Sequence, residues 1–488
     1  MTDLAPPPSP PGAPPTAARK KKKGAASLYA AHEKVHPRQV SGRFRTIKWV
    51  VDVVLVGFFL VCPWLRWDRG PGVPDQAILL DMAGRRGYLL DVEIWPQEVY
   101  YLTGVLILGA IGLFLATALL GRVWCGFTCI QTVFTDIFQW IEYRIEGDRA
   151  ARQKLDAGPW TLGKIARKTV KTILWLVVSL IVSHTWLIYF NDAPTATRAV
   201  LDGSASAEFY GYLALFAGTT FLLAGYAREQ VCIYMCPWPR FQAAMFDEDS
   251  LIVTYETWRG EPRGPARAGQ AFEGRGHCVD CTMCIQVCPT GIDIRDGSQL
   301  ACIGCGLCID ACDQIMTRVG LPPGLITYDS TANQVARSKG EPTRVRLVRP
   351  RTVLYAGVMV AVLTVMVAAL VLRSRFDVNV LHERSPLFVT MSDGSIRNGY
   401  TVKVLNMDRG PHSFALTTEG VAGARLSVIG HGAGDGAGVD LPVEGDSVGT
   451  FRVYVSAEGG ARSRALAFVV TERSSGHTRR YETIFAGP

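Results

Sequence analysis

The cysteines between residues 278 and 312 have the spacing of iron–sulfur ligands. They form two runs with the same internal spacing, Cys278, Cys281, Cys284 and Cys288, then Cys302, Cys305, Cys308 and Cys312. Two-residue gaps let the first three thiolates of a run converge on one cuboidal cluster, while the fourth thiolate serves the other cluster. The pattern therefore predicts two [4Fe–4S] clusters as cofactors. Their predicted ligands are Cys278, Cys281, Cys284 and Cys312 for cluster 1, and Cys302, Cys305, Cys308 and Cys288 for cluster 2.

Zinc ribbons and disulfides are the two alternatives for a segment this rich in cysteine. A pair of Cys₄ zinc ribbons would use two CxxC pairs and leave the third and fourth Cys of each run without a role. Disulfides need an oxidising compartment, whereas twelve of the 13 cysteines fall in segments predicted at or inside the cytoplasmic face of a membrane, Cys62 being the exception. We therefore expect a bacterial-type dicluster ferredoxin domain of α+β class at about residues 268–320, which carries single electrons.

Five apolar stretches indicate that this domain belongs to a membrane protein. The 488 residues are 48% hydrophobic and 19% charged, and stretches of about 20 apolar residues are what a bilayer core of roughly 30 Å requires. The predicted spans are 47–65, 99–120, 170–190, 209–227 and 353–372. Asp52 in the first span and His184 in the third are ionisable, which makes them functional candidates, although an interfacial position or an interhelical hydrogen bond would also explain them.

The distribution of Lys and Arg predicts the orientation of the spans. Basic residues such as Lys20 to Lys23 precede the first span, the loop 67–98 is acidic, the loop 121–169 is basic, and six Lys and Arg at 337–351 precede the fifth span. Because basic loops stay on the cytoplasmic side, the amino terminus and the ferredoxin domain should be cytoplasmic and the carboxyl-terminal tail outside. The net charge of +8 is then mostly a topology signal, and we expect no nucleic-acid partner.

These boundaries give the expected domain organisation. Residues 1–46 should be a disordered, Pro-rich and basic cytoplasmic tail. A four-helix membrane region follows at 47–227, then a cytoplasmic segment at 228–352 that contains the ferredoxin domain, and then the fifth span.

Two further cysteine pairs lie just past the inner ends of two predicted spans. They are Cys125 with Cys129 and Cys232 with Cys236, each with CxxxC spacing. Residues i and i+4 share a helix face, so each pair could present two thiolates toward the other. Soft sulfur ligands suit Cu(I), zinc or an iron–sulfur cluster, and a redox dithiol is also possible, while free Cys is often only a small packing residue. Repetition at matching positions favours a function, and we take these four as a candidate catalytic site for copper or redox chemistry.

The tail after Arg375 has the pattern of an all-β domain. Short segments at 400–405, 451–455 and 465–470 are rich in β-branched and aromatic residues, and clusters of Gly, Asp and Ser separate them. About seven such strands predict a carboxyl-terminal all-β immunoglobulin-like sandwich at 376–488. This tail has no cysteine and no evident acid–base constellation, so we expect a binding or scaffolding role.

Several motifs resemble the FixG/CcoG/RdxA family. The resemblance is carried by residues 288–297, 308–313 and 228–237, and it extends over about residues 25–488. It implies an accessory role in maturing cbb3-type cytochrome c oxidase, with copper handling as the task, in a bacterial inner membrane, which would make the outer domain periplasmic. One departure is Ile130 after Cys129, where the family commonly has Pro.

Two classes of function fit these observations. The first is a membrane oxidoreductase, a cupric reductase that takes copper as substrate; a quinol-linked electron-transfer subunit is its variant. Its electron donor must be external, because the chain has neither GxGxxG after a strand nor CxxCH. The second is a non-enzymatic assembly scaffold with structural clusters. Expected partners are membrane lipid, cbb3-type oxidase subunits or copper chaperones and transporters, and a donor that the sequence does not identify.

Overall fold

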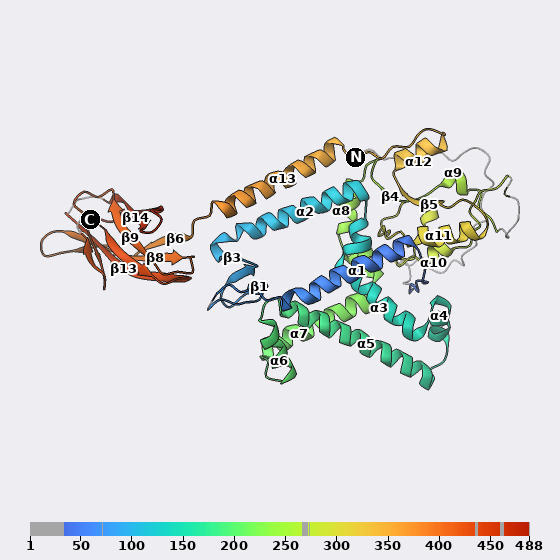
Figure 1. The fold of residues 1–488 in the computed structure, drawn as a ribbon, viewed down its shortest axis with the longest axis horizontal. Helices are drawn as coiled ribbons and strands as arrows, with labels where there is room; N and C mark the ends of the chain where they lie inside the picture. Colours follow the sequence, from blue (N-terminus) through green and yellow to red (C-terminus); the bar gives the residue numbers. More distant parts are fainter. Residues whose placement is uncertain are drawn as a thin grey trace, which may run out of the picture. The chain divides into compact units, whose positions relative to one another are not determined.

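The structure is a computed structural model that describes residues 34–70, 72–265, 272, 274–434, 438–458 and 463–487. The chain forms two compact units, Met1–Leu363 and Thr364–Pro488. The first contains four long apolar helices, the ferredoxin segment and the start of a fifth helix, and the second contains the end of that helix and the β-sheets of the tail (Figure 1).

Five helices in the described part of the chain are long and apolar enough to cross a membrane. They are Arg43–Trp64, Pro96–Leu120, Leu162–Leu187, Ala207–Ala227 and Pro350–Val371. Each coincides with one predicted span, but the third begins at 162 rather than 170, because two polar turns with Lys164 and Lys168 extend the helix beyond its apolar part. The surfaces of these helices are largely apolar and exposed, as lipid requires.

The elements of the membrane region follow the chain order in Figure 1. They are α1 (Arg43–Val61), η1 (Cys62–Trp64), β1 (Ile78–Asp81), β2 (Arg86–Leu89), β3 (Val92–Ile94), η2 (Pro96–Glu98), α2 (Tyr100–Leu120), η3 (Trp124–Thr128), α3 (Ile130–Glu146), α4 (Arg149–Ala157), α5 (Leu162–Leu187), α6 (Ala193–Leu201), α7 (Ala207–Thr220), η4 (Phe221–Ala227), η5 (Val231–Met235) and α8 (Trp238–Met245). Strands β1, β2 and β3 form a small antiparallel sheet in the loop between the first two spans, which the sequence did not predict.

A compact core fixes where the fourth span ends. Phe138 of α3 and Trp175 of α5 are buried, and their rings stack with centroids 5.3 Å apart. Gly225 of η4 lies against this pair, since a Cβ atom there would be 3.0 Å from the Trp175 ring. A residue without a side chain is needed at this crossing. The contact therefore positions the segment that follows η4, which contains Cys232.

The ferredoxin segment is built on two short antiparallel strands and several helices. These are β4 (Ile252–Tyr255), α9 (Thr257–Gly260), α10 (Met283–Gln286), η6 (Ile294–Asp296), α11 (Leu307–Arg318), β5 (Ile326–Asp329) and α12 (Thr331–Ser338), followed by the fifth span, α13 (Pro350–Val371). Buried Val253, Ile309 and Met316 form its core with the cysteines. The α+β class predicted for this domain agrees with these elements.

The start of α1 is joined to the ferredoxin segment. The carboxylate of Asp310 on α11 accepts hydrogen bonds from the backbone N–H groups of Phe44 and Arg45 at 3.1 and 2.8 Å, which satisfies two free donors of the first helical turn. The backbone N–H of Arg38 donates to the carbonyl of Gln286 at 2.7 Å. The prediction of a disordered tail is thus wrong for residues 34–46, because backbone contacts hold this part in place; residues 1–33 lie outside the described residues.

The second unit is a sandwich of two antiparallel sheets. Its strands are β6 (Phe376–His382), β7 (Val389–Thr390), β8 (Ile396–Asn406), β9 (His412–Glu419), β10 (Arg425–Val428), β11 (Gly432–Gly434), β12 (Val439–Val443), β13 (Ser447–Ala457), β14 (Arg464–Glu472) and β15 (Thr478–Phe485). One sheet has the order β11-β10-β13-β8-β6, with β7 beside β8, and the other β12-β9-β14-β15. Inward residues such as Val402, Val453 and Phe468 are fully buried between them. The three segments predicted as strands lie in β8, β13 and β14.

Candidate functional site

The eight ferredoxin cysteines line two small neighbouring cavities. The first is lined by Cys278, Cys281, Cys284 and Cys312, and the second by Cys288, Cys302, Cys305 and Cys308, with Cys284 at its edge. The fourth cysteine of each run therefore lies with the first three of the other run. Helix α11 connects the cavities, because Cys308 and Cys312 are one turn apart on it.

The electrostatics of these cavities fit an iron–sulfur cluster. Burial raises the pKa of the Cys305 thiol to about 12, and neighbouring Cys288 raises it as well. Burial likewise raises the pKa of Cys312, and the cysteines of the first run, Cys284, Cys278 and Cys281, add to the effect. Thiols grouped in this way ionise together only when a cation offsets their charge, which is the situation in a thiolate-held cluster.

The other two cysteine pairs come together to form a four-cysteine site, defined as Cys125, Cys129, Cys232 and Cys236. Cys125 lies in η3 and Cys232 in η5, and both elements are single π-helical turns with i to i+5 hydrogen bonds. The backbone N–H of Cys129 donates to Trp124 at 2.9 Å, and that of Cys236 donates to Val231 at 2.8 Å. The sequence predicted an α-helical spacing, and the wider turn is a correction; single π turns are frequent at functional sites.

The thiols of the four-cysteine site influence one another. Burial raises the pKa of Cys125 to about 12, and the neighbouring Cys129, Cys232 and Cys236 contribute to this rise. Cys232 has a pKa raised to about 12 for the same reasons. The Cys125 thiol donates a hydrogen bond of 3.2 Å to the Gln242 side chain, while Cys236 is exposed. The site thus has a buried side and an accessible side.

The four-cysteine site packs directly on the ferredoxin cavity of Cys305. A Cβ atom on Gly126 would lie 2.9 Å from the Cα atom of Cys305, so the two backbones are in contact. Cys125 and Cys232 pack against the apolar cluster that contains Cys305. Arg122 fastens the contact, since its guanidinium donates to the carbonyls of Cys302 and Pro239, both at 2.8 Å. These contacts place the four-cysteine site directly against the ferredoxin segment, through backbone packing and hydrogen bonds.

A buried ion cluster that could not be predicted from the sequence supports the second pair. Glu142 of α3 accepts a hydrogen bond of 2.6 Å from Arg228, and Arg152 and Lys171 lie 3.1 and 3.5 Å from the same carboxylate. All four side chains are at least nine-tenths buried. Of its members, Arg228 lies four residues before Cys232 in the sequence, whereas Glu142, Arg152 and Lys171 lie far from that pair.

The two intramembrane candidates have different surroundings. His184 lies 2.9 Å from the Thr197 hydroxyl of α6, which is the hydrogen-bonding role expected as its alternative. Asp52 is buried, and its carboxyl lies within hydrogen-bonding reach of the Asp136 carboxyl of α3. Among the residues described, no three His, Cys, Asp or Glu side chains stand close enough together to hold a single metal ion.

Comparison with family models covers all three parts of the chain. Residues 227–331 match a "4Fe-4S dicluster domain", and residues 102–146, which include Cys125 and Cys129, match a "4Fe-4S binding domain". Residues 366–488 match the "IG-like fold at C-terminal of FixG".

Three relatives are similar to this chain over most of its length. The protein RdxA of Cereibacter sphaeroides is 47% identical over 437 residues, which are 89% of this chain and 91% of that protein. The nitrogen fixation protein FixG of Rhizobium meliloti is 44% identical over 482 residues, 93% of this chain and 92% of FixG. The protein RdxB of Cereibacter sphaeroides is 44% identical over 471 residues, 95% of this chain and 98% of RdxB.

Proposed function

Because the chain belongs to the family of FixG and RdxA, we propose that it is an iron–sulfur electron-transfer protein of the bacterial inner membrane that reduces Cu(II) to Cu(I) during assembly of a cbb3-type cytochrome c oxidase. The charge asymmetry of the loops favours a cytoplasmic ferredoxin domain and a periplasmic immunoglobulin-like domain. The observation that carries the proposal is the backbone contact between Gly126 of the four-cysteine site and Cys305 of the ferredoxin segment.

The chemistry of sulfur explains why such a site would favour copper reduction. Soft thiolates hold Cu(I) in preference to Cu(II), so a site built from them raises the potential of the copper couple and helps drive the uptake of one electron per ion. When bound, the two clusters supply single electrons. The chain's own residues provide the ion site and keep the distance to the ferredoxin cavity short.

The two pairs have different tasks in this proposal. Cys236 is exposed and caps the π turn that contains Cys232, so this pair receives copper. Two sulfurs rather than four are assigned to the ion, in keeping with the spacing of the described side chains. Cys125 packs against the apolar cluster that contains Cys305 and adjoins Gly126, whose backbone touches that of Cys305, which suits a role in the electron path. The arginines Arg122 and Arg228 position the two turns.

The proposed orientation of the spans also determines which partners the other parts of the chain could contact. The periplasmic domain would contact an oxidase subunit or a copper chaperone or transporter, while membrane lipid surrounds the five spans. The electron donor is external to the described elements.

Formation of Cu(I), followed with a Cu(I)-specific chelator, tests the proposal. Full-length protein in detergent is reduced with dithionite, freed of excess reductant and mixed with Cu(II). We expect the double variant Cys232→Ser/Cys236→Ser to lose Cu(I) formation while it keeps the iron content of the wild type. Cys62→Ser, at the far end of α1, is the matched control and should react like the wild type. Equal rates for the double variant and the wild type would remove the second pair from the reaction.

A further inference from the structure

A large cavity lies inside the membrane region beside the four-cysteine site. It has a volume of about 600 Å³ and is bounded by α1, α3, α5 and α7 with η4. Its walls are mainly apolar, with Leu55, Phe134, Trp186 and Phe216 among them. The volume falls in the usual range for small-molecule sites, about 300–1,000 Å³. Because the surrounding helices face lipid, a lipid-soluble molecule could reach this cavity from the bilayer.

One end of the cavity adjoins the first cysteine pair. Thr128 and Ile130, the residues on either side of Cys129, both line it, and so does Gln131. The Gln131 side-chain nitrogen donates to the backbone carbonyl of Leu223 at 2.8 Å, so this residue also ties the cavity wall to the end of the fourth span. A molecule in the cavity would therefore contact the two residues that flank Cys129 in the chain.

The polar groups of the cavity wall are mostly hydroxyls whose protons are already used. Thr128 donates to Trp124 at 3.1 Å, Ser183 to Ser179 at 2.7 Å and Thr219 to Leu215 at 2.8 Å, each along its own helix. Their oxygens keep lone pairs that can accept a hydrogen bond. Such a wall suits an apolar ligand that carries O–H donors, whereas an acyl chain has no donor that could pair with these acceptors.

A buried carboxylate lies one helical turn from the cavity. Asp52 precedes Leu55 and Val56 of the cavity wall by three and four residues, so it shares their face of α1. Its two oxygens are buried, and its carboxyl lies within hydrogen-bonding reach of the Asp136 carboxyl. Its charged neighbours are Lys48, Asp136 and Arg45.

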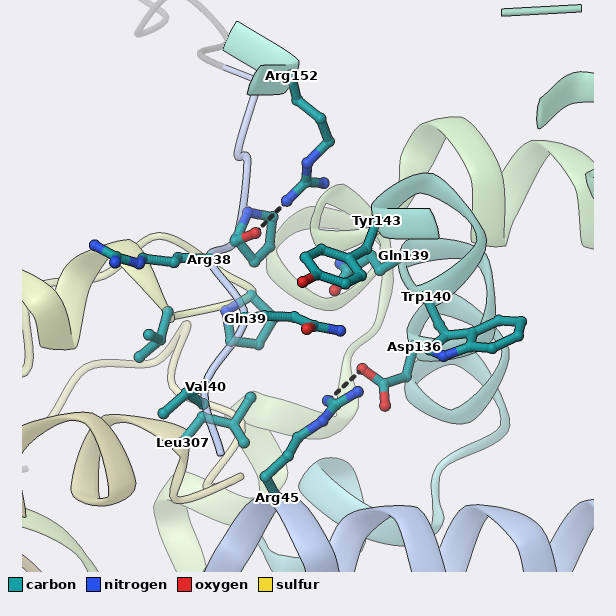
Figure 2. A pocket seen from close by; sticks show the side chains of 13 residues that line it. Arg38, Gln39, Val40, Arg45, Asp136, Gln139, Trp140, Tyr143, Arg152 and Leu307 are labelled. Atoms are coloured by element: carbon teal, nitrogen blue, oxygen red, sulfur yellow. Dashed lines mark hydrogen bonds and ion pairs between the residues drawn. The ribbon is translucent and has the colours of Figure 1, made fainter. Parts of the chain in front are cut away.

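The charged neighbours of Asp52 lie on the side of it that faces away from the cavity and toward the ferredoxin segment. Asp136 forms an ion pair with Arg45 at 2.9 Å and lies 3.6 Å from Lys48. Figure 2 shows the Arg45–Asp136 pair at a second pocket, together with Gln139 and Tyr143. Asp52 and Asp136 thus connect the membrane cavity with this polar pocket.

We propose that the cavity binds an isoprenoid quinol, which is the electron donor of this protein, with Asp52 as the first acceptor of its protons. The proposed binding depends only on the cavity. The proposed electron transfer also depends on the copper reduction proposed above. One quinol loses two electrons and two protons and becomes a quinone, while two Cu(II) ions each gain one electron. The protons leave through Asp52 and Asp136 toward the pocket of Figure 2.

Binding is tested on the full chain with a photoreactive azido-ubiquinone as the probe. We expect labelled peptides from residues 128–134, 182–186 and 216–224, and competition by decylubiquinol but not by added phospholipid. Thr220→Phe fills the cavity and should lower labelling at least tenfold, whereas Leu222→Phe, at an exposed residue of η4 in the same span, should leave it unchanged. Labelling spread over all lipid-facing helices, or displaced by phospholipid, would mean that the cavity holds only acyl chains and would overturn the proposal. The competition experiment on the wild type decides the point even if Thr220→Phe does not fold.

Electron donation is tested with decylubiquinol as the reductant and Cu(I) formation as the readout. We expect Thr220→Phe to lose the quinol-driven reaction and to keep the dithionite-driven one. Asp52→Asn should keep labelling but slow the quinol-driven reaction at least tenfold, and an unchanged rate would overturn the proton route. If dithionite-reduced wild type forms no Cu(I), the copper proposal fails while specific labelling still supports the quinol site. If dithionite works and decylubiquinol does not, the quinol is not the donor.

Discussion

The backbone of Gly126 lies against that of Cys305, so that a Cβ atom added to Gly126 would be 2.9 Å from the Cα atom of Cys305. Backbone atoms cannot move aside as a flexible side chain can. Gly126→Ala should therefore push the four-cysteine site and the ferredoxin segment apart, at a cost of about 1–3 kcal/mol typical of overpacking. We expect slower Cu(I) formation after dithionite reduction, with both clusters still present by iron content.

Gly57→Ala is the control for this change. Gly57 also lies in a helix, and nothing lies within 4 Å of a Cβ atom placed there. Its Cu(I) formation should equal that of the wild type. If Gly126→Ala reacts at the wild-type rate with a wild-type melting temperature, the contact has no part in electron transfer.

The buried Glu142 cluster should be required to hold the second cysteine pair. Glu142→Gln would leave Arg228 and Arg152 buried without this counter-charge, while Lys171 would keep Glu146 at 3.0 Å. Breaking one partner of a buried ion pair costs about 3–5 kcal/mol, so we expect a lower denaturation midpoint in detergent. Glu208→Gln, at an exposed acid in the first turn of α7, should have little effect. A midpoint equal to that of the wild type would show that the cluster does not stabilise the fold.

The same cluster gives a pH dependence with a defined sign. Burial alone would raise the pKa of Glu142, but Arg228, Lys171 and Arg152 outweigh burial and lower it from 4.5 to about 2. A lowered pKa means that the stabilisation is complete above about pH 4.5 and is lost as the pH falls toward 2. Glu142→Gln should lack this part of the acid sensitivity, measured as the difference in denaturation midpoint between pH 6 and pH 3.

Some of these features could be predicted from the sequence because they depend on local spacing. The five spans follow from apolar length, and the grouping of the ferredoxin cysteines follows from the gaps within their runs. The strand β13 could be recognised by its alternation, whereas β7 and β11 are too short to show a period. The contact of Gly126 with Cys305 and the pair of Glu142 with Arg228, 86 residues apart, depend on how helices pack. Hydropathy carries no information about that packing. The π turns also depend on the packing and could not be predicted either.

The crossed arrangement of the cluster ligands predicts which cluster each cysteine supports. Anaerobically purified protein should contain roughly eight iron ions and eight sulfides per chain. Cys312→Ser should damage the cluster of Cys278, Cys281 and Cys284, whose cavity it lines, and leave the other one intact. Cys288→Ser should have the reciprocal effect. Electron paramagnetic resonance of the reduced variants distinguishes the clusters, and loss of the cluster local to the mutated run would contradict this assignment.

The orientation of the spans predicts the results of reporter fusions. A reporter fused after Gly340, before the fifth span, should be active as a cytoplasmic protein, because the loop that precedes the span is basic. A reporter fused after Arg397, beyond that span, should be active as a periplasmic protein. Alkaline phosphatase and green fluorescent protein give opposite signals in the two compartments. The reverse pattern at either position would contradict the proposed orientation.

The immunoglobulin-like domain should fold by itself and bind through its surface rather than through a metal. Its core is closed by buried residues of both sheets, such as Tyr400, Phe414 and Phe468. We expect residues 376–488 to be a soluble β-protein by circular dichroism, without bound metal. Deleting this domain should weaken association with an oxidase subunit or a copper-delivery protein while leaving the iron content unchanged. Stoichiometric metal in the isolated domain would contradict a pure binding role.

The stability of this isolated domain should fall in acid, in part through Glu472. Burial raises the pKa of this carboxyl, but hydrogen bonds from Ser475 and Ser474 and the nearby His412 outweigh burial and hold the pKa below 4.5. A lowered pKa means that Glu472 stabilises the fold above about pH 4.5 and that this contribution is lost as the pH falls below that value. In urea denaturation we therefore expect Glu472→Gln to be less stable than the wild type at pH 6, with the difference shrinking by pH 3.5. Glu482→Gln on β15, whose side chain is 78% exposed, is the control and should follow the wild type at both pH values. A difference between Glu472→Gln and the wild type that stays constant from pH 6 to pH 3.5 would show that the carboxylate charge is not what stabilises this end of the sandwich.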